Sequence, residues 1–203
     1  MPIDFESALG RAKALIFDCD GTLVNSLPVY SKAWGAGFAL SGTKMNDHWY
    51  QARNGLSEHV LMDEFERDYN VVLDRKKIVA TMRSHYRQNL SAHLTEISLI
   101  CDIARRFYGQ LPMAVASGGS REIVTQSLDA LGLTYLFQKI ISFDDVRKAK
   151  PLPDLFLHAA QALGIEPRDC LVFEDSPQGI EAAHAANMSV INVDTLLPLH
   201  INT

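Results

Sequence analysis

The sequence lacks the features that mark secreted, disulfide-bonded or membrane-spanning proteins. It contains only three cysteines (Cys19, Cys101 and Cys170), an odd number without a CxxC spacing, so no disulfide framework is indicated. No apolar run approaches the roughly 18 residues that a membrane-spanning helix needs. The first residues have neither the basic nor the apolar region of a signal peptide. We therefore expect a reduced, cytoplasmic protein without a membrane partner.

An excess of positive charge is also missing. The sequence has 24 acidic and 19 basic side chains and a formal net charge of −5. This balance gives no general attraction to nucleic acid, and an anionic ligand must be held by local cations. The seven histidines show no HxH or HExxH spacing, which argues against a zinc site. With 47% hydrophobic and 21% charged residues among 203, the composition is that of a folded chain.

Strand-like and helix-like patterns alternate over most of the chain. Residues 12–18 are expected to form the first strand, because the four consecutive apolar residues Ala14–Phe17 are typical of a strand buried on both faces. Further strand patterns lie at residues 113–116, 139–141, 170–173 and 189–193. Helical patterns lie at residues 97–107, 120–131, 154–163 and 177–186. This alternation predicts an α/β fold with a doubly wound parallel sheet.

Between residues 25 and 92 the strand patterns disappear and helical spacing replaces them. Helices are expected over residues 27–40, 56–69 and 74–90, the last with Asp74 as its N-cap. We interpret residues 25–92 as a small helical domain inserted after the first strand. Residues 1–24 and 93–203 then form the α/β core, with residues 1–11 as a polar lead-in.

Polar side chains follow three of the predicted strands. Asp18 and Asp20 end the first strand, the Ser117–Ser120 loop (Ser-Gly-Gly-Ser) follows the second, and Glu174 and Asp175 follow the fourth. Ligands of open parallel sheets bind beyond the carboxyl ends of the strands, so we expect these residues to converge. Four carboxylates at one edge predict a hard divalent cation held through oxygen, most simply Mg²⁺.

Two further features of the same region suit a phosphate group. The Ser117–Ser120 loop leads into a helix, whose first N–H groups and positive dipole end attract anions. The alternative is an ordinary turn with Ser120 as the N-cap. Lys150 precedes Pro151 and is thereby kept out of the helical conformation. It is either a cation that balances Asp18 and a phosphate, with Lys148 as its nearest competitor, or a solvated loop lysine.

The helical block supplies candidates for substrate contacts. Arg53 and Asn54 lie at a junction between two expected helices, where they either contact a substrate or belong to a capped turn. Trp34 and Trp49 are interpreted as core residues rather than as ligand platforms. Cys19, between the two aspartates, is expected to face the packed interior without a nucleophilic role.

These motifs resemble those of the haloacid dehalogenase superfamily. Asp18-Cys19-Asp20-Gly21-Thr22, Ser117, Lys150-Pro151 and Glu174-Asp175 match the four motifs of that family in order and spacing. The helical insertion resembles the family's small cap. Residues 112–118 and 172–180 are similar to the sugar-phosphate phosphatase and β-phosphoglucomutase branch, in particular to its fructose-1-phosphatase-like members. The resemblance implies a Rossmann-like core and Mg²⁺-dependent hydrolysis of a small phosphate monoester such as a sugar phosphate.

The resemblance also implies a role for each motif residue. Asp18 would attack phosphorus and form an aspartyl-phosphate, and Asp20 would serve as general acid and then general base. Thr22 would brace Asp18 within the phosphate-binding site. The phosphoryl group would be held by Ser117, the Gly118 N–H and Lys150. Mg²⁺ would be bound by Asp18, the backbone carbonyl of Asp20, Asp175 and, directly or through water, Glu174.

Other functions fit the sequence less well. The mutases of the same branch carry a His where Tyr30 stands and an Arg where Glu58 stands, and a dehalogenase lacks the second aspartate, Asp20. A phospho-receiver module would share the acidic pocket but not the helical insertion. A non-catalytic metabolite-binding protein would not need a competent residue at every motif position. We expect a monomer that acts on a small-molecule phosphate ester and does not bind nucleic acid.

Overall fold

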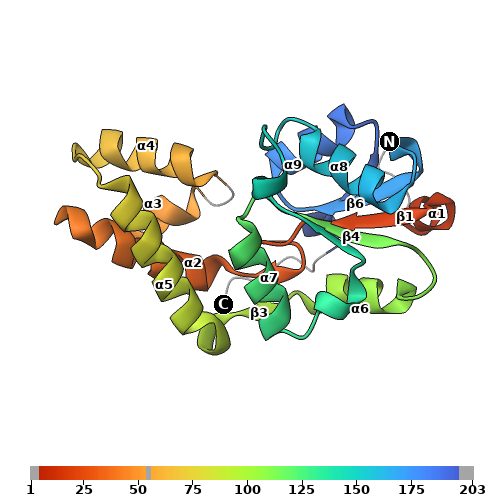
Figure 1. Ribbon diagram of the computed structural model, residues 1–203, viewed down its shortest axis with the longest axis horizontal. Helices are drawn as coiled ribbons and strands as arrows, with labels where there is room; N and C mark the ends of the chain where they lie inside the picture. The colour runs from red at the N-terminus through yellow and green to blue at the C-terminus, as the bar shows by residue number, and fades with distance from the viewer. Residues whose placement is uncertain (1–4, 54–55, 197–203) are drawn as a thin grey trace. The chain divides into compact units, whose positions relative to one another are not determined.

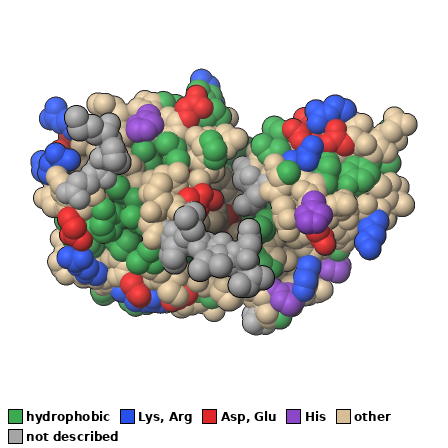
Figure 2. Space-filling view, turned by 180° about the vertical axis from the view of Figure 1, so that it is seen from behind, with side chains coloured by type: hydrophobic (Ala, Val, Ile, Leu, Met, Phe, Trp, Pro, Cys, Tyr) green, Lys and Arg blue, Asp and Glu red, His purple; other side chains and the backbone are tan. Residues whose placement is uncertain are grey.

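The computed structural model describes residues 5–53 and 56–196 (Figure 1). These residues form two compact units: one contains the described residues up to Val24 and from Glu96 onward, and the other contains those between Asn25 and Thr95. Within the described residues, no helix is long and apolar enough to cross a membrane. Acidic and basic side chains are interspersed over the face shown in Figure 2.

The first unit is a parallel α/β sheet, as the alternating patterns predict. The strand order is β5-β4-β1-β6-β7, and every neighbouring pair is parallel. The strands are β1 (Ala14–Phe17), β4 (Met113–Ala116), β5 (Lys139–Ile141), β6 (Cys170–Glu174) and β7 (Ser189–Asn192). The helices are α1 (Phe5–Arg11), α6 (Ser98–Phe107), α7 (Arg121–Ala130), α8 (Asp154–Leu163) and α9 (Pro177–Ala185). Helices α8 and α9 cover one face of the sheet and α6 and α7 the other (Figure 1).

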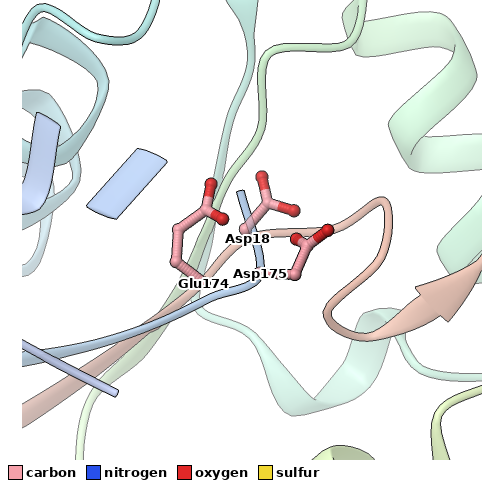
Figure 3. A group of neighbouring side chains, drawn as sticks. All are labelled: Asp18, Glu174 and Asp175. Carbon is pink, nitrogen blue, oxygen red and sulfur yellow. The ribbon is translucent and has the colours of Figure 1, made fainter. Parts of the chain in front are cut away.

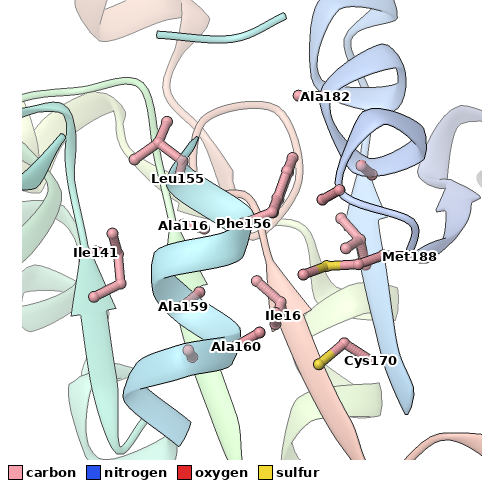
Figure 4. Close-up of a cluster of buried hydrophobic side chains, with 14 of the residues drawn as sticks. Ile16, Ala116, Ile141, Leu155, Phe156, Ala159, Ala160, Cys170, Ala182 and Met188 are labelled. Atoms are coloured by element: carbon pink, nitrogen blue, oxygen red, sulfur yellow. The ribbon is translucent and has the colours of Figure 1, made fainter. Parts of the chain in front are cut away.

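β1 occupies the centre of the sheet because its residues are apolar and fully buried on both faces. Ala14 and Ile16 pack into the cluster that includes Phe156 of α8 (Figure 4). Phe17 belongs to the opposite face, since side chains alternate along a strand. There it stacks on Phe173 of β6, with ring centroids 4.8 Å apart. The central strand is thus fixed from both sides, which holds its carboxyl end in place.

The second unit is helical and is built around stacked aromatic rings. Its helices are α2 (Leu27–Phe38), α3 (Asp47–Gln51), α4 (Glu58–Tyr69) and α5 (Arg75–His93). The rings of Phe38 and Phe65 stack with centroids 3.8 Å apart, and Trp34 stacks on Phe38 at 5.2 Å. Trp49 meets Phe65 edge-on at 5.3 Å. Both tryptophans therefore serve packing, as the sequence indicates.

Several short elements differ from the sequence predictions. Residues 5–11 of the expected polar lead-in form α1, and α3 lies in a stretch without a predicted element. The expected 27–40 helix stops at Phe38 and continues as the 3-10 turn Ala39–Ser41. The strands β2 (Val24–Asn25) and β3 (Thr95–Glu96) pair as a separate small sheet. These elements have too few residues to show a periodic pattern.

Candidate active site

Asp18 continues directly from the central strand. Its N–H donates to the carbonyl of Phe173 over 2.9 Å, which extends the β1–β6 ladder by one residue. The chain then turns back sharply, since the carbonyl of Cys19 accepts the N–H groups of Leu23 and Val24, each over 2.9 Å. Cys19 is fully buried, as expected for a residue that faces the interior. The turn fixes the carboxylate of Asp18 at the carboxyl end of the sheet.

Three carboxylates meet at this end of the sheet. Asp18, Glu174 and Asp175 each offer an oxygen atom, and these atoms lie within 4.8 Å of one another (Figure 3). They come together because β1 and β6 are parallel neighbours in register, with Phe17 opposite Phe173. The residues that follow these two phenylalanines therefore emerge side by side.

Lys150 reaches into the carboxylate group from the loop before α8. Its Nζ lies 2.5 Å from Oδ1 of Asp18 and 2.7 Å from Oε1 of Glu174, and its side chain is only 10% exposed. The ammonium also lies 5.0 Å from the centroid of the Phe156 ring. Lys148 is exposed. The structure thus brings Lys150, and not its competitor, to the carboxylates.

The charges of the site are unbalanced. Burial raises the pKa of Asp18, and the nearby Glu174 and Asp175 raise it further. Lys150 lowers this pKa, but the net effect leaves it well above its ordinary value. Burial also raises the pKa of Asp175 to about 7, with a contribution from Glu174 and an opposing hydrogen bond from Thr22. Burial alone would lower the pKa of Lys150, but Asp18 and Glu174 outweigh it and raise that pKa. Three carboxylates around one ammonium leave negative charge that a further cation would neutralise.

The Ser117 loop lies beside Asp20. Ser117 is buried and its Oγ accepts the N–H of Gly119 over 3.1 Å. A Cβ atom placed on Gly119 would lie 3.4 Å from the Ser117 hydroxyl and 3.5 Å from Oδ2 of Asp20. One placed on Gly118 would meet nothing within 4 Å. The loop therefore brings the second aspartate and the serine hydroxyl to the same short stretch of backbone.

Residues 15–193 match the family model of the haloacid dehalogenase-like hydrolases. The chain belongs to this family. The match spans the sheet of the first unit and the helical second unit alike. The resemblance seen in the four motifs is thereby confirmed for the chain as a whole.

Individual relatives support the same assignment. Fructose-1-phosphate phosphatase YqaB of Escherichia coli is 32% identical over 186 residues, which cover 92% of this chain and 98% of the relative. Hexitol phosphatase A of Escherichia coli is 29% identical over 189 residues, covering 91% of this chain and 84% of the relative. A predicted phosphoglycolate phosphatase from Haemophilus somnus has a similar structure, with a TM-score of 0.80 and 23% identity over 89% of this chain and 84% of its own. At that identity the likeness concerns the fold.

One motif residue of this hydrolase has a different partner from the one expected. The sequence comparison implies that Thr22 braces Asp18, but its hydroxyl donates to Oδ1 of Asp175 over 3.0 Å. The turn after Cys19 carries Thr22 across to the end of β6, which explains the difference. Thr22 therefore steadies a neighbouring carboxylate of the same group.

Arg53 is engaged within the helical unit. Its guanidinium pairs with Glu64 over 2.6 Å and with Asp68 over 2.9 Å, and it lies 4.3 Å above the ring of Trp49. These contacts hold Arg53 within the helical unit, and its contact with a substrate stays a prediction. Asn54 lies outside the described residues.

Ser176 and Gly179 support the site but were not singled out from the sequence. The N–H and hydroxyl of Ser176 donate to the carboxylate of Glu174 over 2.9 and 3.2 Å. The same hydroxyl accepts the N–H of Gly179 over 3.0 Å and so caps α9. A Cβ on Gly179 would overlap the Glu174 carboxylate. A Ser followed by Pro is a helix-start signal that points to this cap, though not to its second contact.

Proposed function

We propose that this hydrolase cleaves a small sugar phosphate in a Mg²⁺-dependent reaction that passes through a phosphorylated Asp18. Its family and its named phosphatase relatives make it a phosphoric monoester hydrolase. The observation that carries the finer proposal is the buried group of three carboxylates with Lys150 at the ends of β1 and β6. The sugar-phosphate class is supported by relatives that are named for fructose 1-phosphate and hexitol phosphates.

The donor set suits a hard divalent cation. Asp18, Glu174 and Asp175 offer carboxylate oxygens within 4.8 Å of one another, and such oxygens are the ligands that Mg²⁺ prefers. We propose that these residues and the backbone carbonyl of Asp20 hold the ion. When bound, Mg²⁺ would neutralise charge on the phosphate oxygens and favour attack on phosphorus.

We propose that Asp18 is the nucleophile. Its carboxylate is almost fully buried and is fixed by the β1–β6 ladder, so little motion must be lost before attack. Lys150 donates to one of its oxygens, Oδ1, which leaves Oδ2 to approach phosphorus. The same ammonium favours the ionised, nucleophilic form of Asp18 and would also attract the negative phosphate oxygens.

Asp20 is the residue that we propose for the proton transfer. It follows Asp18 by two residues, and its Oδ2 lies 3.5 Å from the position that a Cβ on Gly119 would take. We propose that it protonates the leaving alcohol and then removes a proton from the attacking water. The Ser117 hydroxyl already accepts from Gly119, so its own proton points to another acceptor, for which a phosphate oxygen is suited.

The mutase alternative has less support. Tyr30, where the mutases carry a histidine, packs against the ring of Tyr86 with centroids 4.5 Å apart. Glu58, where they carry an arginine, faces Arg83 over 3.4 Å. Neither residue supplies the basic group of the mutase motif. We propose that the helical unit instead selects the alcohol part of a phosphate ester.

Asp18→Asn and Asp20→Asn test the mechanism. Asp18→Asn should lower kcat by more than about 10³-fold because the nucleophile is lost. Asp20→Asn should lower kcat by about 10²–10⁴-fold for sugar phosphates and less for p-nitrophenyl phosphate, whose leaving group needs no proton. The measurement is phosphate release with Mg²⁺ from a panel of sugar phosphates and from the aryl ester.

Asp169→Asn is the matched control, because Asp169 pairs with Lys13 over 2.9 Å at the amino ends of β1 and β6. It should retain wild-type turnover. Near wild-type turnover in Asp18→Asn would rule out the phosphorylated-aspartate mechanism. An equal loss on both substrate types in Asp20→Asn would rule out the proton-transfer role.

A further inference from the structure

The turn after β5 is tied to the loop before α7 by contacts that the proposed reaction does not use. The N–H of Phe143 donates to the carbonyl of Gly119 over 3.0 Å. The N–H of Arg121 donates to Oδ2 of Asp144 over 2.8 Å, and its guanidinium pairs with Asp145. We call these five residues, from the 143–145 turn η3 and the 119–121 segment, the turn clamp.

One oxygen atom joins the two halves of the turn clamp. Oδ2 of Asp145 accepts the N–H and the hydroxyl of buried Ser142, each over 2.8 Å, as well as the guanidinium of Arg121. Burial alone would raise the pKa of Asp145, but the hydrogen bonds from Arg121 and Ser142 outweigh it and lower that pKa to about 2. Asp145 is therefore ionised at neutral pH, which strengthens each of these bonds.

The start of α7 depends on this turn rather than on its own N-cap. Ser120 occupies the N-cap position, but its hydroxyl makes no capping hydrogen bond. The first N–H of the helix is instead accepted by Asp144, and a carboxylate at this end also suits the helix dipole. The position of the helix end is thereby set by the neighbouring turn.

The turn clamp lies between two candidate phosphate-binding elements. On one side, Gly119 donates to the Ser117 hydroxyl, and the N–H of Ser117 donates to the carbonyl of Ile141 over 2.9 Å. On the other side, residues 146–149 lead from Asp145 to Lys150. The clamp therefore connects the Ser117 loop to the turn from which the chain leads to Lys150.

We propose that Asp145 is a positioning residue that sets the Ser117 loop against Lys150 and thereby controls the affinity of the site for a phosphoryl group. This inference rests on the proposed phosphatase function. Asp18 and Asp20 follow β1, a separate segment, and Lys150 is itself held by Asp18 and Glu174. Loss of the clamp should therefore weaken phosphate binding and leave the rate of the chemical step largely unchanged.

The test compares Asp145→Asn and Arg121→Gln with the control Asp169→Asn. In the first two variants, KM for the ester and the inhibition constant of inorganic phosphate should each rise about fivefold or more, while kcat stays within about threefold of wild type. Asp169→Asn loses an ion pair of similar kind at the other end of the sheet and should change neither constant. Arg121→Gln keeps the bonds between Asp145 and Ser142, so it isolates the tie between the two segments.

Unfolding in urea separates positioning from stability. Asp145→Asn should also lower the free energy of unfolding, since it weakens the hydrogen bonds to Ser142. The double variant Asp145→Asn/Arg121→Gln should bind phosphate no more weakly than the weaker-binding single variant, because both changes break the same tie.

An unchanged phosphate inhibition constant in Arg121→Gln would overturn the proposal, as would a loss confined to kcat. The proposed phosphatase function is tested separately by calorimetric titration of the wild-type protein with inorganic phosphate in the presence of Mg²⁺. If that protein neither binds phosphate nor releases it from any ester, the proposed function itself is wrong.

Discussion

At the scale of single residues, Glu174 shows how a buried carboxylate of the site is stabilised by hydrogen bonds. Its carboxylate is 1% exposed and accepts from Lys150 and from the N–H and hydroxyl of Ser176. A buried carboxylate with that many donors is well compensated. Asp175, its neighbour in sequence, accepts a side-chain hydrogen bond from Thr22. Adjacent acids in one motif thus have different surroundings.

Replacement of Gly21 should cause both backbone strain and steric overlap. Its φ of 94° is rarely adopted by other residues, and a Cβ there would overlap the Asp175 carboxylate. Gly21→Ala should therefore lower the free energy of unfolding by about 3 kcal/mol or more and displace Asp175. The measurement is urea unfolding together with phosphatase activity.

Gly109→Ala is the control for that change. Gly109 has a φ of 74°, but a Cβ there would meet nothing within 4 Å, so only the strain of about 1–2 kcal/mol remains. Its activity should match the wild type. Equal losses of stability in the two variants would show that the overlap with Asp175 has no energetic consequence.

At the scale of elements, the longer strands and helices follow the sequence patterns closely. The predicted 113–116 and 139–141 strands and the 154–163 helix coincide with β4, β5 and α8. The Gly after the last of these takes a left-handed conformation with φ 69°, which ends the helix as predicted. β2 and β3 went unpredicted because each has two residues and exists only through pairing with a distant segment.

The N-cap of α5 offers a test at this scale. The side chain of Asp74 accepts the N–H of Lys77 over 3.2 Å, as the sequence predicts for a cap. Asp74→Ala should lower the free energy of unfolding by about 1 kcal/mol. Ser57→Ala is the matched control, because Ser57 occupies the N-cap of α4 without a side-chain capping bond. Urea unfolding that shows the same loss in both variants would contradict the assigned cap.

At the scale of the whole molecule, the proposed cation site would couple cation binding to folding. Three acids packed around one lysine cost free energy when the chain folds without a cation. A cation that binds only the folded chain removes this cost, and at 100 times its dissociation constant it adds about 2.7 kcal/mol of stability. An arrangement that favours a metal ion in this way lowers the stability of the folded chain when no metal is bound.

The pH dependence of stability tests this cost. The pKa of Asp175 is about 7 in the folded chain and about 3.9 in an unfolded one, so the folded state binds the proton more tightly. Metal-free stability should be highest near pH 4, fall as the pH rises, and reach its low plateau above pH 7. Asp175→Asn should thus be more stable than the wild type by about 1–3 kcal/mol at pH 8 in EDTA, with the difference shrinking toward pH 5.

Addition of Mg²⁺ provides the complementary measurement. It should raise the urea midpoint of the wild type at pH 8 and leave that of Asp175→Asn nearly unchanged, because one of the proposed ligand carboxylates is gone. The surface variant Asp169→Asn should respond to Mg²⁺ like the wild type. A destabilised Asp175→Asn in EDTA at pH 8 would show that the acidic group carries no folding cost.

The sequence by itself determined the parallel α/β class, the longer elements and which polar residues follow the strand ends. Periodic apolar patterns and motif spacing are local properties, and they suffice to place Asp18, Ser117 and Glu174 at the same edge of a parallel sheet. The haloacid dehalogenase resemblance rested on the same residues, and the family match confirms it.

The tertiary structure alone decided which side chains meet. Thr22 contacts Asp175 rather than Asp18, and Arg53 is held by acids of its own helical unit. The link from Asp145 to Arg121 likewise joins two loops that no sequence pattern relates. Such pairings depend on strand register, on the path of each turn and on which charges share a buried space. Those are properties of the packed chain, since a side chain finds its partner only after the backbone has brought distant segments together.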